Sequence, residues 1–334
     1  MKHANISIFV PHVGCPRQCS FCNQHAITGE AEAPAAADVR ETAAQSAAQL
    51  GERVHSAEIA FFGGSFTAVP RDYMVSLLEA AHESVKEFGF AGIRCSTRPD
   101  AVGEEVLYLL KKYGVTAVEL GAQSMDDEVL SLNRRGHTSG QTEAAAQRVK
   151  AFGFQLGLQM MTGLYGDTDG RALETAERMI ALKPSTVRIY PTVVLQGTYL
   201  AELYARGEYT PQTLEEAVTL CALLLPLFED AGIKVIRMGL HAQTAVEAQK
   251  LAGPYHPAFR ELVQSRVFLE KLLSCLEKPG RYVVRVHPQS ISVALGQGKK
   301  NREILRQKGL LVTFLQDEAV PRGLFSVDGS GNSV

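Results

Sequence analysis

The 334-residue sequence predicts an α/β fold, a partial or complete (β/α) barrel followed by a small C-terminal α+β appendage. Short apolar segments rich in β-branched residues alternate with longer helical patterns, which is typical of parallel strands joined by right-handed crossovers. This alternation weakens after about residue 250. We therefore expect a barrel domain over residues 1–250 and a smaller α+β extension over residues 251–334.

Seven segments are expected to form the parallel sheet, because each is short, apolar and rich in β-branched or aromatic residues. They are Asn5–Val10, Ala57–Phe62, Ile93–Thr97, Ala117–Gly121, Gln155–Met161, Thr186–Pro191 and Ile233–Met238. Six or seven strand–helix units favour a barrel over an open sheet, although periodicity by itself is compatible with both.

Helical patterns fill the intervals between these segments. The first, Ala35–Leu50, begins after Pro34 and ends before Gly51, which are typical start and stop residues. The second, Arg71–Phe88, places its apolar residues on one face. Further helices are expected at Glu104–Lys112, Ser139–Phe152, Arg171–Leu182, Thr213–Asp230 and Pro257–Leu276.

The C-terminal region has a different pattern. We expect short strands at Arg281–His287, Ser290–Leu295 and Leu310–Leu315, with a basic helix over Lys299–Lys308. Between residues 281 and 308, seven basic residues accompany one acidic residue, Glu303. The seven are Arg281, Arg285, Lys299, Lys300, Arg302, Arg306 and Lys308. Such a surplus suits a phosphate backbone, but a short charged helix is equally compatible with a solvated face.

Composition limits the class of protein. The formal net charge is −2, from 34 basic and 36 acidic residues, which argues against a protein that coats nucleic acid by bulk charge. No apolar run approaches the ~18 residues of a membrane span, and the first residues lack the pattern of a signal peptide. We therefore expect a cytoplasmic protein whose thiols stay reduced.

The six cysteines divide into two groups. Three of them, Cys15, Cys19 and Cys22, fall within eight residues directly after the first expected strand, where barrel enzymes carry their chemistry. Three thiolates at this spacing can hold a [4Fe–4S] cluster and leave one iron open. A zinc site completed by His12 or His25 and a chance cluster of buried thiols are the alternatives. The other three, Cys95, Cys221 and Cys275, are expected to pack as small apolar side chains.

The Cys15-to-Cys22 loop, with Phe21 before its last cysteine, resembles the signature of the radical S-adenosylmethionine (SAM) superfamily. Further motifs follow in order near successive strand ends, at residues 60–67, 96–100, 119–124, 133–138, 160–164 and 189–192. Together they are most similar to the radical SAM half of elongator complex subunit 3, the subunit that modifies the wobble uridine of tRNA. A more distant similarity links them to oxygen-independent coproporphyrinogen oxidase. The resemblance covers about residues 5–240.

This resemblance implies two cofactors, a [4Fe–4S] cluster bound by Cys15, Cys19 and Cys22 and a SAM molecule on its open iron. The positions that match SAM contacts of the superfamily are Phe21, Gly63, Gly64, Ser96, Gln123, Arg135 and Gln159. A glycine pair lets the backbone approach a ligand closely, and a guanidinium fork suits a carboxylate. Arg134 is an alternative to Arg135, and Ser96 and Gln159 are equally compatible with ordinary polar residues at a barrel mouth.

The resemblance also implies a function, reductive cleavage of SAM to a 5′-deoxyadenosyl radical for modification of a tRNA or RNA base, with an electron donor as partner. Substrate contacts are expected among Arg98, His137, Tyr190 and Arg237. Two alternatives stay open. One is radical chemistry on a small molecule such as a tetrapyrrole, and the other is a non-catalytic zinc or iron–sulfur protein that binds nucleic acid.

The match to elongator subunit 3 has two exceptions. The residues after about 250 are too few for its acetyltransferase-like domain, and the first expected strand begins by about residue 5, without its N-terminal tRNA-binding extension.

Overall fold

The computed structural model describes residues 4–10, 15, 19–23, 32–240, 244–276 and 278–328. The chain forms two compact units. The first comprises Met1–Thr213 and Leu227–Tyr255, and the second comprises Leu214–Pro226 and His256–Val334. The division at residue 250 stays our proposal for the boundary between domains.

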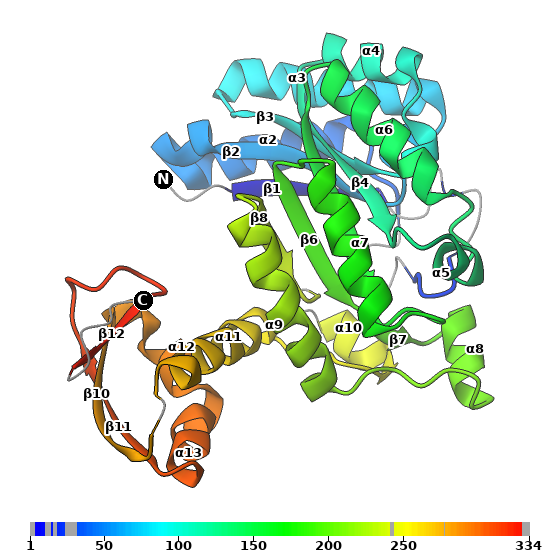
Figure 1. Ribbon diagram of the computed structural model, residues 1–334. Helices are drawn as coiled ribbons and strands as arrows, with labels where there is room; N and C mark the ends of the chain where they lie inside the picture. The colour runs from blue at the N-terminus through cyan, green and yellow to red at the C-terminus, as the bar shows by residue number, and fades with distance from the viewer. Residues whose placement is uncertain are drawn as a thin grey trace. The chain divides into compact units, whose positions relative to one another are not determined.

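A seven-stranded parallel sheet forms the centre of the first unit, in the order β1-β2-β3-β4-β5-β6-β8. Its strands are β1 (Ala4–Val10), β2 (Ala57–Gly63), β3 (Gly92–Thr97), β4 (Val115–Gln123), β5 (Gln155–Thr162), β6 (Thr186–Pro191) and β8 (Lys234–Met238). The sheet twists and curls, with helices α6 and α7 against one face (Figure 1). Because β1 and β8 lie at opposite ends of this order, the predicted (β/α) architecture is confirmed as a partial barrel.

The expected helices between these strands are present. They are α2 (Ala36–Leu50), α3 (Arg71–Phe88), α4 (Glu104–Lys112), α6 (Ser139–Ala151), α7 (Asp169–Ala181) and α9 (Leu214–Asp230). In α3, Met74, Leu77, Leu78 and Ala81 are buried at helical spacing, and the helix ends at Gly89 with φ of 77°. Amphipathic periodicity therefore positions helices such as α3 on the sheet.

Several short elements escaped prediction because their length is too small for a periodic signal. They are α5 (Asp127–Leu132), α8 (Tyr199–Ala205), α10 (Thr244–Gln249) and the pair β7 (Val194–Leu195) and β9 (Lys250–Ala252). Short 3₁₀ turns occur at Gly51–Ser56, Phe66–Ala68 and Pro99–Ala101. None of the helices within the described residues combines the length and apolar character that a membrane crossing requires.

The second unit is α+β, as expected, and packs its helices on a three-stranded sheet of order β11-β10-β12. Its elements are α11 (Phe259–Cys275), β10 (Gly280–Val286), 3₁₀ turns at Pro288–Ser290 and Gln297–Lys299, α12 (Ile291–Leu295), α13 (Lys300–Gln307), β11 (Leu310–Gln316) and β12 (Phe325–Asp328). Strand β11 runs parallel to β10, whereas β12 runs antiparallel to it.

One predicted element of this unit is wrong. The sequence predicts a strand over Ser290–Leu295, but Ile291–Leu295 forms helix α12, which packs Ile291 and Ala294 into the core. Five apolar residues are compatible with both periods, and packing against α11 selects the helix.

Candidate active site

A cavity of about 240 Å³ opens at the carboxyl ends of strands β1 to β6 in the first unit. Alternate residues of the strands face it, such as Glu119, Gly121 and Gln123 on β4, because side chains of a strand alternate between its two faces. All ten residues that the sequence singled out for cluster or SAM binding line this cavity. They are Cys15, Cys19, Phe21, Cys22, Gly63, Gly64, Ser96, Gln123, Arg135 and Gln159.

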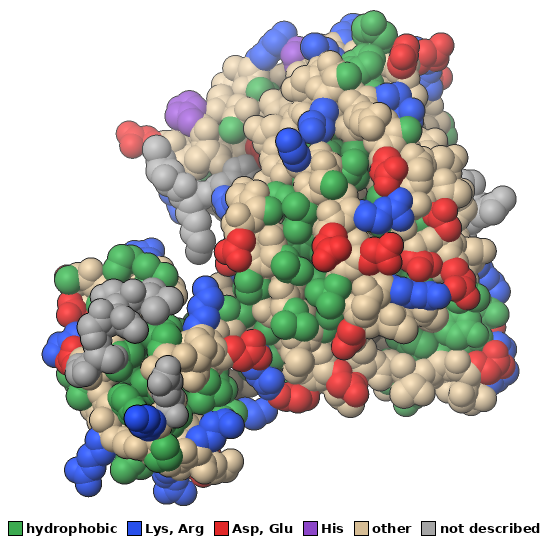
Figure 2. All heavy atoms as spheres, in the orientation of Figure 1, with side chains coloured by type: hydrophobic (Ala, Val, Ile, Leu, Met, Phe, Trp, Pro, Cys, Tyr) green, Lys and Arg blue, Asp and Glu red, His purple; other side chains and the backbone are tan. Residues whose placement is uncertain are grey.

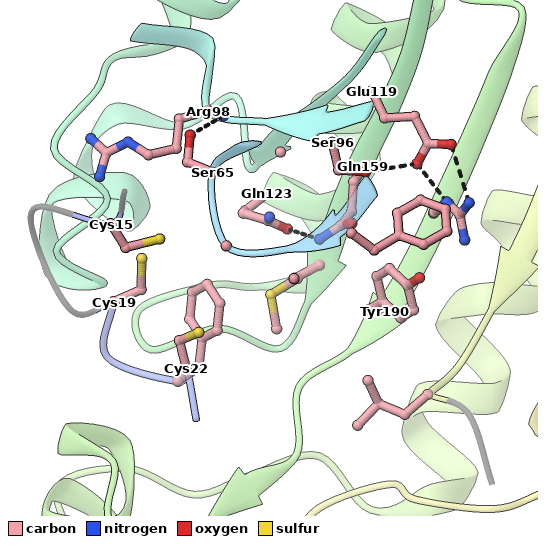
Figure 3. A pocket seen from close by; sticks show the side chains of 18 of the residues that line it. Cys15, Cys19, Cys22, Ser65, Ser96, Arg98, Glu119, Gln123, Gln159 and Tyr190 are labelled. Atoms are coloured by element: carbon pink, nitrogen blue, oxygen red, sulfur yellow. Dashed lines mark hydrogen bonds and ion pairs between the residues drawn. The ribbon is translucent and has the colours of Figure 1, made fainter. Parts of the chain in front are cut away.

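The three cysteines lie at one side of the cavity, opposite Glu119 and Tyr190 (Figure 3). Their segment is fastened to the rest of the unit through Ser20. The Ser20 hydroxyl donates to Asn133 Oδ1 at 2.7 Å, the Ser20 N–H donates to the Asn133 carbonyl at 3.1 Å, and the Ser20 carbonyl accepts from Leu200 N at 2.7 Å. His12 and His25, the alternative fourth ligands of a zinc site, lie outside the described residues.

Two buried arginines flank the cysteines. Arg135 donates through Nη1 to Cys19 Sγ at 3.0 Å and through Nη2 to the Gly121 carbonyl at 2.6 Å. Arg98 donates from Nε and Nη2 to Asp100 at 2.8 and 2.6 Å. Within the described residues, Arg135 Nε and Arg98 Nη1 are buried without a partner. Because an unpaired buried donor is costly, these two atoms indicate that an anionic group belongs in the cavity.

These side chains fit an anionic cluster. Burial raises the pKa of the Cys15 thiol, while the nearby Ser65 backbone, Arg98 and Arg135 favour its thiolate. Among the described residues, no three His, Cys, Asp or Glu side chains are grouped closely enough to share one metal ion. An iron–sulfur cluster has a different requirement, because each of its thiolate ligands binds a separate iron.

The glycine pair joins the ends of β1 and β2. Gly63 has φ of 106°, and a Cβ there would lie 2.9 Å from the Val10 carbonyl oxygen. The Gly64 N–H donates to that same oxygen at 2.8 Å. Glycine at position 63 is therefore needed for the approach of two strand ends, while both glycines also border the cavity.

The amide and hydroxyl side chains across the cavity contact one another. Gln159 Nε2 donates to Gln123 Oε1 at 3.2 Å, and Ser96 Oγ donates to Glu119 Oε2 at 3.4 Å. Gln123 holds φ of 68°, which is uncommon for a residue other than glycine, next to a register shift between β4 and β5. This bend aims its amide into the cavity, as the close view shows (Figure 3).

Sequence reasoning missed a buried network of four charges. Arg94 bridges two carboxylates, with Nη2 2.8 Å from Glu58 and Nη1 3.1 Å from Glu119. Arg188 donates from Nε to Glu119 Oε2 at 2.7 Å and from Nη2 to Glu119 Oε1 at 3.1 Å. Both Glu119 and Arg188 line the cavity. The signal was present as a single charged residue inside each of four largely apolar strands, β2, β3, β4 and β6.

A glycine lets this network cross a strand. Glu119 is on β4 and Arg188 on β6, so β5 lies between them. The residue of β5 beside Glu119 is Gly157, where a Cβ would lie 2.7 Å from Glu119 Cγ. The missing side chain leaves the space through which the Glu119 carboxylate reaches Arg188.

Only some of the expected substrate contacts lie at the cavity. Arg98 and Tyr190 line the cavity, whereas His137 and Arg237 are outside its lining. His137 is buried and lies 3.3 Å from the Ala122 carbonyl, and burial together with Arg135 lowers its pKa to about 4. Arg134, the alternative to Arg135, instead stacks 3.3 Å above the Tyr199 ring.

The remaining cysteines lie apart from the cavity lining. Cys95 and Cys221 are buried and Cys275 is partly buried, consistent with packing roles.

Comparison with known proteins relates this geometry to a family. The Radical SAM superfamily model matches residues 9–179, and the Radical SAM C-terminal domain model matches residues 184–268. The tRNA uridine(34) acetyltransferase of Methanocaldococcus jannaschii is 32% identical over 190 residues, 51% of this chain and 35% of the relative. Elongator complex protein 3 of Mus musculus is 33% identical over 201 residues, 54% of this chain and 36% of the relative. The chain thus spans about a third of the length of these relatives.

Solved structures show the same fold. The Elp3 of Methanocaldococcus infernus, 22% identical, matches with a TM-score of 0.62 over 80% of this chain and 63% of the other. Coproporphyrinogen III oxidase of Escherichia coli, 18% identical, matches with a TM-score of 0.50 over 80% and 59%. With more than half of its length matched by the superfamily model, this chain belongs to the radical SAM superfamily, whose cofactors are a [4Fe–4S] cluster and S-adenosylmethionine.

Proposed function

We propose that this protein is a radical SAM enzyme that modifies a base of RNA, with tRNA as the substrate class. One observation carries the chemistry: three cysteines and the unpaired edges of Arg98 and Arg135 border one cavity at the strand ends. The substrate class rests on the relatives, because those named above are a tRNA uridine(34) acetyltransferase and elongator complex protein 3.

In this proposal Cys15, Cys19 and Cys22 ligate the cluster. The chemistry that the bound cofactors supply is one-electron cleavage of SAM to methionine and a 5′-deoxyadenosyl radical. The contact of Arg135 with Cys19 Sγ keeps positive charge beside a negatively charged cluster, which stabilises the thiolate ligands. The partnerless Arg98 Nη1 and Arg135 Nε are suited to a carboxylate such as that of the methionyl group.

The other lining residues orient the nucleoside part of SAM. The Gln123–Gln159 pair offers amide donors and acceptors, and Phe21 offers an aromatic face beside the adenine. Because Ser96 donates a hydrogen bond to Glu119, we assign to it a contact with a ribose hydroxyl that hydrogen-bonds the same carboxylate. Tyr190 lies on the side opposite the cysteines (Figure 3), and Arg188 lines the same cavity in an ion pair with Glu119; these are the side chains that we assign to the substrate.

The first experiment tests the chemistry. After anaerobic reconstitution with iron and sulfide, the wild-type protein and a Cys275→Ala control are expected to show a charge-transfer chromophore and to form 5′-deoxyadenosine with a reductant. Cys19→Ala is expected to do neither. The proposal is wrong if Cys19→Ala still cleaves SAM, or if the wild-type protein holds one zinc ion per chain that iron loading leaves unchanged.

The second experiment tests the substrate class. Mass spectrometry of tRNA nucleosides, from cells with and without the gene, is expected to show one modified nucleoside that disappears. A small metabolite that changes while every nucleoside stays constant would favour the small-molecule alternative.

A further inference from the structure

A glycine-rich loop joins two helices of the second unit. We call residues 296–299, with the sequence Gly-Gln-Gly-Lys, the glycine loop. It lies between α12 and α13, and the strands that flank this helix pair, β10 and β11, are parallel neighbours in the sheet. The order is therefore strand, helix, glycine loop, helix, strand.

The glycine loop leaves its outer side open. Gly298 has φ of 61°, and a Cβ at this position would meet nothing within 4 Å. The positive φ favours glycine here, and because no protein atom lies beside the missing side chain, an outside molecule can approach the backbone. Lys299 also holds a positive φ, of 62°, although this conformation favours glycine. The Lys299 side chain is exposed, so its charge faces solvent next to the open backbone of Gly298.

The inner side of the glycine loop is fixed. A Cβ on Gly296 would lie 3.0 Å from the Asn301 side chain, so the loop packs directly on that residue. Asn301 is 5% exposed, and its Nδ2 lies within 2.9–3.3 Å of acceptors on Ser265, Val293 and Ala294. This one amide connects α13 to α11 and α12, so the open face is presented in a defined geometry.

The charge of the chain is divided between its two parts. The second unit carries 12 lysines and arginines against nine acidic residues, whereas the first unit carries 22 against 27. Beside the glycine loop, Lys300 pairs with Glu215 and Arg306 with Glu303. Lys299 and Arg302 are exposed and form no ion pair with any described residue. Basic side chains surround an apolar area on the visible face of this unit (Figure 2).

We propose that the glycine loop, with Lys299 and Arg302, binds the sugar–phosphate backbone of single-stranded RNA. KH domains hold four nucleotides of a single strand against a Gly-x-x-Gly loop, and here Lys299 stands at the last glycine position with a left-handed backbone. An open loop backbone admits phosphates, and two unpaired cations neutralise them. This inference rests on the proposed function, to which it adds a second RNA contact surface.

The test measures binding directly. Cluster-loaded full-length protein is titrated into a fluorescein-labelled single-stranded 12-nucleotide RNA, and anisotropy is followed at several salt concentrations. Lys299→Gly/Arg302→Gln removes two charges while keeping a backbone that glycine adopts readily. Its Kd is expected to rise about tenfold, and the slope of log K against log salt to fall by about 1.4, or 0.7 for each phosphate that is no longer neutralised. Gly298→Asp is expected to weaken binding similarly, because its carboxylate occupies the open side.

The matched control is Lys271→Gln/Arg322→Gln, which removes two exposed charges of the same unit that are not part of the glycine loop or of α13, and it is expected to keep Kd within about twofold. Circular dichroism verifies that each variant is folded.

Wild-type affinity and salt slope in the loop variant would overturn the inference, as would displacement of the RNA by poly-glutamate of equal charge. If loop-dependent RNA binding is found but no tRNA nucleoside depends on the gene, the proposed function fails and this surface stands. If a nucleoside depends on the gene but the loop variant binds normally, only the surface is wrong.

Discussion

Replacing Arg94 by methionine should destabilise the protein far more than a comparable change at its surface. Arg94 lies between Glu58 and Glu119, and the three side chains are 6%, 7% and 3% exposed. Without Arg94, Glu58 keeps the hydroxyl of Thr116 at 3.0 Å, while Glu119 keeps Arg188. The substitution breaks two buried ion pairs at once by removing their shared cation, which costs about 3–5 kcal/mol of the free energy of unfolding.

Arg40 provides a control with the same chemistry in water. Its Nη2 lies 2.9 Å from Glu83, close to the 2.8 Å between Arg94 and Glu58, but the two side chains are 50% and 60% exposed. Exposed pairs contribute about 0.2–1 kcal/mol, so Arg40→Met should shift the urea midpoint only slightly. Both variants are compared with the wild type by urea unfolding, followed by circular dichroism at equal cluster loading.

The double variant Arg94→Met/Glu58→Leu tests whether the buried Glu58 carboxylate is a source of this cost. It removes both members of the pair, so it should recover at least about half of the stability that the single variant forfeits. The reasoning is refuted if Arg94→Met costs no more than Arg40→Met, or if the double variant is less stable than Arg94→Met.

Three further outcomes are expected. The pKa of His137 is lowered from 6.5 to about 4, so the unfolded chain binds more protons; the free energy of unfolding should fall as pH drops from 6.5 toward 4, and His137→Gln should flatten this fall. A profile unchanged by His137→Gln would contradict this assignment. Tyr209→Phe removes a buried hydroxyl that donates to the Gly163 carbonyl at 2.6 Å and should cost about 1–2 kcal/mol in urea unfolding, against less than about 0.5 for Tyr204→Phe, at 40% exposure. Lys299→Gly relieves a positive φ and should add about 0.5–1 kcal/mol; a lower melting temperature would count against this.

Much of the sheet and the position of the cavity followed from sequence. Parallel strands buried on both faces are continuous apolar segments, so β2 to β6 stood out from the helices between them. The cysteine spacing is local, and the residues near strand ends meet because parallel strands end at one edge. Gln123 and Gln159 could thus be assigned to one mouth although 36 residues separate them.

The contacts themselves were beyond prediction. Whether Arg135 meets Cys19, 116 residues away, depends on how the cysteine segment is fastened at Ser20 and Asn133. The fate of Ser290–Leu295 was decided by packing on α11, which no short window contains. Likewise, Glu58 and Arg94 in β2 and β3 are isolated charges until the strand register brings them together.

Gly157 has a consequence for how this sequence can evolve. The Cβ of an alanine at this position would clash with Glu119 Cγ. If the Glu119 side chain moved away to avoid the clash, Arg188 would lose its ion pair with Glu119. A substitution at any one of these three positions, on β4, β5 and β6, therefore makes the residues at the other two positions unfavourable for stability. We expect the three to be inherited and exchanged as a set, with a larger residue at 157 accompanied by neutral residues at 119 and 188. An alignment of relatives that pairs alanine at 157 with an intact Glu–Arg pair would argue against this coupling.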